Sequence, residues 1–312
     1  MEPLITIAIC TRNRAAFLGK AIRSVIAQMD GDTELLIANN GSTDDTPQVV
    51  EKFIAAGERI TFIHVAETGL SAARNAVMKN ASGVWVLFLD DDAEAEPGWL
   101  AAYQQFLSAP PNPQVAVVGS EVIPAPEIPP PDWLRDEGKL NLGPIPFRYA
   151  RGSGPWECNC AYRRADVLEI GGFDTRLGHL GSSAGYHEGV DLTTRLQDAG
   201  REIWWMPGAP IQHFIHGGRM NLKWALSSAF NSGRSRATIR LKFRPARRRT
   251  RYILIRILLF PFLFGGSLLL SLLNLLCLNS PKAARALTRA SAITGLTWGL
   301  LQQLGNAIFD HV

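Results

Sequence analysis

Acidic residues are almost absent from the last third of this 312-residue sequence. Positions 203–309 contain 15 Lys and Arg and no Asp or Glu, whereas positions 1–202 contain 17 Lys and Arg against 27 Asp and Glu. The formal net charge of +4 therefore conceals an acidic first part and a basic second part. Nine of the basic residues lie between Arg234 and Arg251, a density that suits nucleic acid or an anionic membrane surface.

Cysteine is scarce, and the sequence shows no secretory leader. The four cysteines lack the CxxC spacing of common zinc sites, and they are too few and too scattered to suggest a disulfide framework. Met1 and Glu2 stand directly before the first apolar segment, so we expect no signal peptide. Both absences suit a protein whose folded part lies in a reducing cytoplasm.

One stretch is too long and too apolar for an ordinary soluble helix. Residues 257–278 are 22 uncharged positions rich in Leu and Phe, enough to cross a hydrocarbon core of roughly 30 Å. A soluble helix of this length would need a polar stripe. Residues 290–309 form a weaker segment that can span, pack on the first or lie at the interface. Three basic residues, Lys282, Arg285 and Arg289, are expected in the loop between them.

The apolar stretch decides how to interpret the basic cluster. Because this cluster directly precedes the stretch, membrane lipid is the expected partner and nucleic acid is not. The positive-inside rule then predicts the cell (inner) membrane, with the first domain in the cytoplasm. The expected regions are a folded domain at 1–233 (halves about 1–118 and 119–233), a basic juxtamembrane segment at 234–252 and a membrane-associated region with one or two hydrophobic helices at 253–312.

A conspicuous acidic motif lies in the first part of the chain. Residues 84–89 form an apolar run that predicts a buried strand, and Asp90, Asp91 and Asp92 follow it directly. Open α/β sheets bind ligands at the C-terminal ends of their strands. Carboxylate oxygens suit Mg²⁺ or Mn²⁺, which usually complete their coordination with water and substrate phosphates. A solvated acidic turn is the alternative interpretation.

Strand and helix patterns alternate before this motif. The expected elements are strands at 5–10, 34–38 and 61–65 and helices at 15–29, 47–56 and 69–78. This alternation predicts an α/β domain with a largely parallel sheet and right-handed crossovers. The polar turns that follow the strands then fall on one edge of the sheet, together with the three aspartates.

Several motifs, in this order and spacing, resemble family 2 glycosyltransferases of the GT-A fold. The segments that carry the resemblance are residues 5–14, 39–44, 69–75, 89–92, 158–161, 171–174 and 187–196. The resemblance covers residues 4 to about 240. It implies a mixed, mostly parallel sheet flanked by helices, followed here by C-terminal hydrophobic helices. It also implies transfer of a sugar from a nucleotide diphosphate donor, with inversion at the anomeric carbon.

The resemblance implies a site for Mn²⁺ or Mg²⁺. A divalent ion would stabilise, as a Lewis acid, the negative charge on the departing phosphate. Asp92 is the first expected ligand, Asp90 supports it, and Asp91 faces the ribose and the water shell of the metal. His213 matches a late histidine that relatives often place near the metal or the diphosphate. A purely structural role for His213 is the alternative.

The nucleotide is expected across the first two strand ends. Thr11 and Arg14 resemble residues that contact the base and the diphosphate. Arg74, in the motif that begins at Gly69, resembles the positive group beneath the diphosphate. Asn39 stands where many relatives have an aspartate that accepts a hydrogen bond from uracil. Since an amide both donates and accepts, a UDP-sugar is the first expected donor and other nucleotides stay open.

An inverting transfer needs a base on the face opposite the leaving group. By resemblance Glu188 is the leading candidate. The family often has two adjacent acids here, and the second position in this chain is Gly189. Asp191, at i+3 on the same expected helix, is the second candidate. Both acids would also complement the helix dipole, which is the structural alternative. Asn159 is expected to be a pocket residue among the nucleotide-sugar contacts.

The sequence therefore predicts a membrane-anchored, metal-dependent inverting glycosyltransferase of the hexosyltransferase type. We expect a membrane-proximal acceptor, a lipid-linked saccharide or other glycan, because the tail would hold the site against the bilayer. Asn39 and Gly189 leave open a noncatalytic nucleotide-sugar-binding protein. A sugar nucleotidyltransferase is the other alternative, but residues 11–14 contain no glycine for its phosphate loop.

Overall fold

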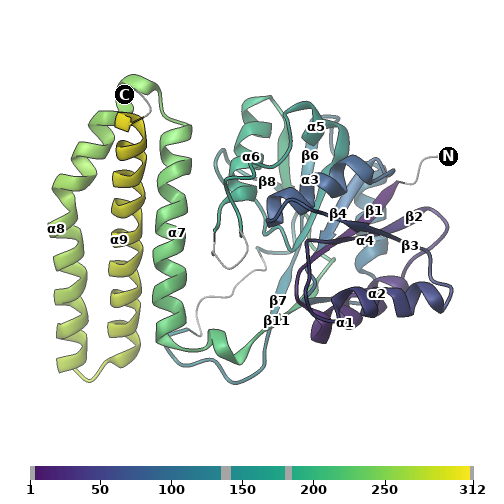
Figure 1. Cartoon of the computed structure of the whole chain (residues 1–312), viewed down its shortest axis with the longest axis horizontal. Coiled ribbons are helices and arrows are strands. Elements are labelled where there is room, and N and C mark those ends of the chain that lie inside the picture. The colour runs from purple at the N-terminus through teal and green to yellow at the C-terminus, as the bar shows by residue number, and fades with distance from the viewer. Residues whose placement is uncertain (1–3, 135–141, 180–184, 310–312) are drawn as a thin grey trace. The chain divides into compact units, whose positions relative to one another are not determined.

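The computed structural model describes residues 4–134, 142–179 and 185–309, with side chains up to residue 304. Figure 1 shows the course of the chain. The chain forms two compact units. The first comprises Met1–Ala125, Gly138–Gly181 and Glu188–Ile215, and the second comprises Pro126–Glu137, Ser182–His187 and His216–Val312.

Two sheets form the centre of the first unit. Their strands are β1 (Ile5–Thr11), β2 (Thr33–Asn39), β3 (Ile60–His64), β4 (Trp85–Leu89), β5 (Ala93–Ala95), β6 (Val115–Gly119), β7 (Val122–Pro126), β8 (Phe147–Arg148), β9 (Asn159–Arg163), β10 (Glu202–Trp205) and β11 (Ile211–Ile215). The large sheet has the order β3-β2-β1-β4-β9-β6-β10-β8, and the small one β5-β11-β7. Neighbours from β3 to β4 are parallel, as are β6 and β10, whereas β9 is antiparallel to both neighbours.

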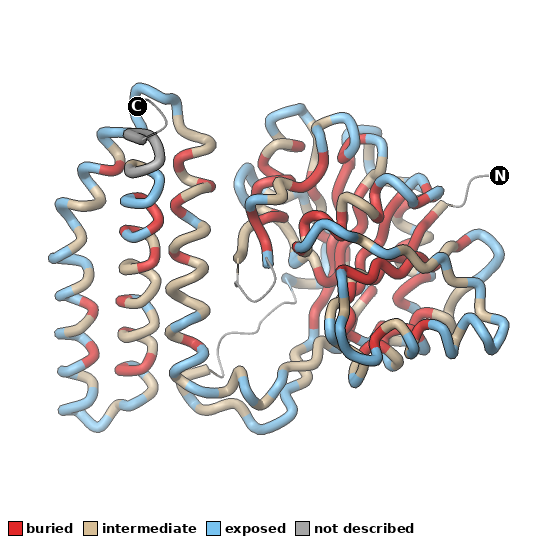
Figure 2. The backbone as a smooth tube through the Cα atoms, viewed as in Figure 1, coloured by how far each residue is buried: buried red, intermediate tan, exposed pale blue. Residues whose placement is uncertain are grey.

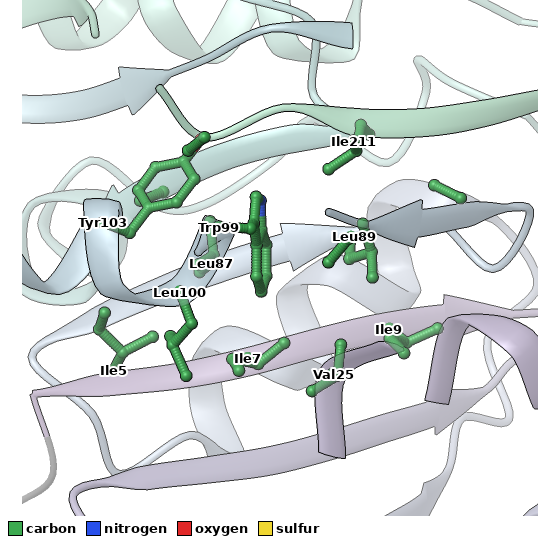
Figure 3. Close-up of a cluster of buried hydrophobic side chains, with 14 of the residues drawn as sticks. Ile5, Ile7, Ile9, Val25, Leu87, Leu89, Trp99, Leu100, Tyr103 and Ile211 are labelled. Carbon is green, nitrogen blue, oxygen red and sulfur yellow. The ribbon is translucent and has the colours of Figure 1, made fainter. Parts of the chain in front are cut away.

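Helices cover both faces of the large sheet. They are α1 (Ala15–Ile26), α2 (Thr46–Ala55), α3 (Leu70–Asn80), α4 (Trp99–Ser108), α5 (Arg164–Glu169) and α6 (Glu188–Asp198). Alternate residues of each strand point to opposite faces. On β4, Leu87 packs with α1 and α4 (Figure 3), and its neighbour Phe88 packs with α3, α5 and α6. The strands are accordingly the most continuously buried part of this unit (Figure 2). The predicted mixed, mostly parallel sheet flanked by helices is confirmed.

The six elements expected before the acidic motif all form, with ends shifted by a few residues. Pro47 lies in the first turn of α2, where its missing N–H costs no hydrogen bond. α1 ends at Ile26 rather than at residue 29, and a turn follows in which Gln28 N donates to Val25 O (2.9 Å).

Asn159, which is expected to be a pocket residue, makes structural contacts in the fold. Its side chain is fully buried at the start of β9. Its amide nitrogen donates to Glu121 O (2.7 Å) and Ala209 O (2.8 Å). Its amide oxygen accepts from Trp99 Nε1 (2.8 Å) and from the Tyr103 hydroxyl (3.1 Å). Every group that a ligand would use is therefore occupied by the fold.

We expect Asn159→Ala to lower the free energy of unfolding by at least about 3 kcal/mol, since it leaves several buried polar groups without partners. Urea denaturation of the detergent-solubilised chain measures this loss. Asn80→Ala is the control, because Asn80 lies on the surface and bonds only within α3, to Ala76 O, and it should cost under about 1 kcal/mol. Equal losses for the two variants would contradict the role assigned to Asn159.

Three long helices dominate the second unit. They are α7 (Leu222–Lys242), α8 (Ala246–Leu276) and α9 (Ser280–Phe309), preceded by the short 3₁₀ helix η1 (Gly217–Arg219). Glycines let α7 and α9 approach closely: a Cβ added at Gly295 would collide with Phe230 O, and one at Gly233 with Ala292 O. The predicted domain boundary at residue 233 falls inside α7, which continues unbroken to Lys242.

The three basic residues expected in the interhelical loop lie instead on α9, so that expectation is wrong. Only residues 277–279 separate the helices, and the Asn279 side chain accepts from Lys282 N at the start of α9.

α8 is a candidate membrane anchor. Among the helices that the structure describes, it is the one long and apolar enough to cross a bilayer, judged by length and composition. It is also mostly exposed, including Leu258, Phe262 and Leu276, each more than 70% accessible. Its few buried positions include Ser267 and Ser271. Such an apolar exterior over a small polar interior is the reverse of a soluble helix.

Candidate active site

The site lies at the edge of the large sheet where the first strands end. β1, β2 and β4 are parallel, so Thr11, Asn39 and the turn after Leu89 come to the same edge. β9 runs antiparallel to β4 and pairs Asn159 with Leu89. Residues just before β9 are therefore brought to this edge too.

Two buried carboxylates follow the end of β4, and both lie near the same arginine, Arg14. Asp91 and Asp92 are at most 9% accessible. Arg14 Nε lies 3.6 Å from Asp91 Oδ1, and Arg14 Nη2 lies 3.6 Å from Asp92 Oδ2. Burial and the Asp92 charge raise the pKa of Asp91 to about 7, although Arg14 and the Thr11 hydroxyl oppose this shift. The negative charge thus exceeds what Arg14 neutralises, which favours a cation here.

His213 reaches the acidic turn from a distant part of the chain. β11 pairs with β5, which begins directly after Asp92, in a register that places His213 opposite Ala93. Phe214 N donates to Asp92 O (2.8 Å), and His213 Nε2 lies 3.3 Å from Asp92 Oδ1. A pocket of about 180 Å³ adjoins Asp92 and is also lined by Lys20 and Phe214.

The donor atoms around His213 fit a divalent cation. Asp90, Cys158 and His213 offer ligand atoms within 4.8 Å of one another. Burial raises the pKa of the Cys158 thiol well above its ordinary value, so this sulfur stays protonated, and hard cations prefer oxygen. The carboxylates of Asp90 and Asp92 with the imidazole of His213 are the better set for Mn²⁺ or Mg²⁺.

Arg74 is a buried arginine that lies between the carboxylates of Glu188 and Asp90. Its Nη1 lies 3.1 Å from Glu188 Oε1 and its Nη2 lies 3.9 Å from Asp90 Oδ1. The rings of Phe88 and Phe173 flank the guanidinium, with centroids 5.6 and 5.5 Å from its carbon. Burial alone would lower the pKa of Arg74, but neighbouring carboxylates, Glu188 foremost, raise it above its ordinary value. Arg74 therefore joins the acidic turn to Glu188.

The two candidate bases occupy different surroundings. Glu188 opens α6, and its carboxyl carbon lies 3.2 Å from where a Cβ on Gly178 would be, so the turn at Gly178 closes on it. Asp191 is fully buried, with Oδ2 2.8 Å from Arg195 Nε. Arg195 also donates to Gly172 O, so this pair ties α6 to a turn. Asp191 has no accessible surface, whereas Glu188 keeps 6%, so Asp191 matches the predicted base role less well than Glu188, because an acceptor must reach the base.

Two asparagines shape the turn that follows β2. Asn39 Oδ1 accepts from Ser42 N (3.0 Å), and its amide nitrogen lies 3.4 Å from His64 Nδ1. Asn40, which sequence reasoning did not single out, holds the turn before α3, since its Oδ1 accepts from Gly69 N (2.8 Å). Gly69 has φ +135°, a conformation that favours glycine.

Sequence reasoning also missed Glu157. It precedes β9, and its carboxyl group fills the space beside Gly189. Burial and the Glu188 charge raise the pKa of Glu157 to about 7, with Arg74 opposing. No local pattern marks it, since residues 157 and 189 meet only in the folded chain.

Comparison with known proteins identifies the family. The sequence model of the family described as "Glycosyl transferase family 2" matches residues 6–170. The chain belongs to glycosyltransferase family 2. The matched residues include the ends of β1, β2 and β4, Arg74 and Glu157, so most of this edge lies within the family 2 domain.

Two similar proteins have names that describe lipid-linked substrates. A glucosyl-dolichyl phosphate glucuronosyltransferase of Haloferax volcanii is 25% identical over 255 residues, which are 77% of this chain and 78% of that protein. A GalNAc(5)-diNAcBac-PP-undecaprenol beta-1,3-glucosyltransferase of Campylobacter jejuni is 33% identical over 105 residues, only 33% of this chain and 34% of that protein.

Solved structures confirm the GT-A fold of this family 2 chain. A mannosyltransferase of Pyrobaculum calidifontis, solved with GDP-Man and Mn²⁺, superposes with a TM-score of 0.59 and 21% identity over 99% of this chain and 81% of that one. The TarS structure of S. aureus covers 94% of this chain and 90% of its own, with a TM-score of 0.52 and 15% identity.

Proposed function

We propose that this family 2 glycosyltransferase is a metal-dependent, inverting enzyme. It transfers a sugar from a nucleotide diphosphate donor to a membrane-proximal acceptor, a lipid-linked saccharide or other glycan. One observation carries the proposal: Arg74 joins the acidic turn after β4, with His213 beside it, to the buried carboxylate of Glu188. A site for a departing phosphate and a proton acceptor therefore belong to one connected cluster.

Each residue has a role in this proposal. Asp92, Asp90 and His213 hold Mn²⁺ or Mg²⁺, which when bound supplies positive charge for the departing diphosphate. Thr11, Asn39 and the Gly69 turn line the nucleoside, and Asp91 faces the ribose. Arg14 exchanges its two carboxylate partners for the phosphates.

Glu188 takes the proton of the acceptor hydroxyl. As that O–H bond breaks, the oxygen bonds to the anomeric carbon, and the bond from this carbon to the phosphate oxygen breaks with its electron pair. Attack from the side opposite the diphosphate inverts the anomeric configuration.

The similar proteins support the donor and acceptor classes. The Pyrobaculum structure contains GDP-Man and Mn²⁺, and solved structures of GalNAc-T7 and TarS contain UDP. The names of the Haloferax and Campylobacter relatives give dolichyl phosphate and undecaprenol as carriers. A UDP-sugar stays the first expected donor. A GDP-sugar is the second, because Asn39 stands where many relatives have an aspartate that binds uracil.

Thermal shift with nucleotide sugars tests the proposal. The detergent-solubilised chain would be melted with GDP-mannose or UDP-glucose, each with and without Mn²⁺. We expect one donor to raise Tm only when Mn²⁺ is present. At a donor concentration of 100 times Kd, binding should stabilise the folded chain by about 2.7 kcal/mol. The same donor should release its nucleoside diphosphate on turnover. Binding without release or transfer would favour a noncatalytic protein. Formation of nucleotide sugar from a nucleoside triphosphate and a sugar phosphate would favour a nucleotidyltransferase.

The tail supports a location at the cell membrane with the first unit in the cytoplasm. We expect the full chain to stay in membranes washed with high salt and to need detergent, because inserted apolar surface is insensitive to salt. A chain ending at Ile215, the last residue of the first unit, should be released without detergent. Fractionation in 1 M salt measures the membrane retention of both chains. At this salt concentration the Debye length is about 3 Å, so attraction between surface charges is screened. Release of the full chain by salt alone would indicate a peripheral enzyme.

A further inference from the structure

Gly189 leaves a gap in the acidic site that another segment fills. It is the second residue of α6 and follows Glu188 directly. A Cβ at position 189 would fall on the carboxyl group of Glu157. The space that an acidic side chain at 189 would enter is thus already occupied by a carboxylate from a distant part of the sequence.

The segment that carries Glu157 packs against two elements and contains a turn. Pro155 occupies the space that a side chain at Gly119 would need, so the segment packs on the end of β6. Gly154 packs against Thr193 of α6, which lies 3.3 Å from where a Cβ would be. Asn159 N donates to Trp156 O (3.2 Å). These contacts hold the segment beside β6 and α6, and they place Glu157 next to the start of α6.

Glu188 pairs with the buried Arg74, and Glu157, which lies beside Gly189, also acts on it electrostatically. The carboxylates of Glu188, Glu157 and Asp90 all raise the pKa of Arg74. Glu188 is the nearest, at 3.1 Å. When a carboxylate in such a pair takes a proton, it loses its charge and leaves the guanidinium buried without its partner, which is strongly unfavourable. A second carboxylate at the same arginine removes that penalty.

We propose that Glu157 is a positioning residue for the transfer: it stays as the counter-ion of Arg74 while Glu188 takes the proton of the acceptor hydroxyl. The acid pair of this enzyme is then assembled from two segments, with Gly189 as the space that admits Glu157. This role rests on the proposed function of Glu188.

A swap of the acid between the two segments tests the inference. The variants are Glu157→Gln, Glu157→Ala, Glu157→Ala with Gly189→Asp, and Glu157→Ala with Gly189→Ala. Glu157→Gln keeps the shape and removes the charge, so we expect kcat to fall about 10- to 100-fold with donor KM within about twofold. The kcat of the double variant with Gly189→Asp should be at least about tenfold higher than the kcat of the double variant with Gly189→Ala. Only the first of these restores a carboxylate. Thermal melting verifies that each variant folds.

The assay uses whichever of GDP-mannose and UDP-glucose the wild type consumes faster with Mn²⁺. An active wild type with an unaffected Glu157→Gln variant overturns the role of Glu157 alone. Equal recovery by the two double variants also overturns it, since filling the space would then suffice. A rise in donor KM with unchanged kcat would make Glu157 a donor contact instead. A wild type that turns over no nucleotide sugar overturns the proposed function and this role with it.

Discussion

Asp92→Ala is expected to lower metal-dependent transfer at least about 1000-fold, because it removes the carboxylate that we propose as a metal ligand and that lies 3.3 Å from His213 Nε2. Folding should change little. Asp92 O still accepts from Phe214 N, and the loss of one charge relieves Asp91, whose pKa the Asp92 charge raises. We therefore expect a free energy of unfolding within about 1 kcal/mol of wild type.

Mn²⁺ titration by calorimetry gives a readout of Asp92→Ala that is independent of turnover. The matched control is Glu94→Ala, two residues along the same turn and strand. Glu94 has a 52% accessible side chain that pairs only with Lys20 on the surface, at 3.6 Å, so its loss should leave metal affinity and kcat unchanged. Undiminished transfer by Asp92→Ala with saturating Mn²⁺ would refute the metal assignment.

Glu188→Gln is expected to lower kcat about 100- to 10,000-fold while donor binding stays unchanged. The amide still accepts a hydrogen bond from Arg74 but takes no proton from the acceptor. Single-turnover transfer and donor affinity by calorimetry separate the two effects.

Asp191→Asn serves as the control for Glu188→Gln. Asp191 is fully buried with Arg195, so we expect this variant to lose stability and to keep its kcat once folded. The reverse pattern, an inactive folded Asp191→Asn beside an active Glu188→Gln, would mean that the base was misassigned.

The sequence predicted those parts of the site that depend on single segments. Hydrophobic runs and polar turns indicated which strands end near Asp90, and a parallel arrangement requires such ends to share an edge. His213 was predicted only by resemblance. The structure explains its place by the pairing of β11 with β5.

Contacts between segments account for what the sequence did not predict. Asn159 was expected in the pocket because it alternates with Cys158 and Cys160 along a strand, yet four partners from other segments use its amide. Glu157 carries no motif, and its position depends on the absence of a side chain at Gly189. The start of α9 at Ser280 was missed because charges near an apolar helix resemble a loop in sequence alone.

The register of β11 on β5 has a consequence for how the enzyme matures. His213 meets Asp92 only when Ile211 pairs with Ala95, and a slip by one residue would turn the imidazole to the opposite side of the small sheet. A nascent chain that has emerged as far as residue 170 already contains the three aspartates but not His213. On the proposed ligand set, full metal affinity would therefore wait for one of the last strands of the first unit, and ribosome-bound intermediates would hold manganese more weakly than the finished domain.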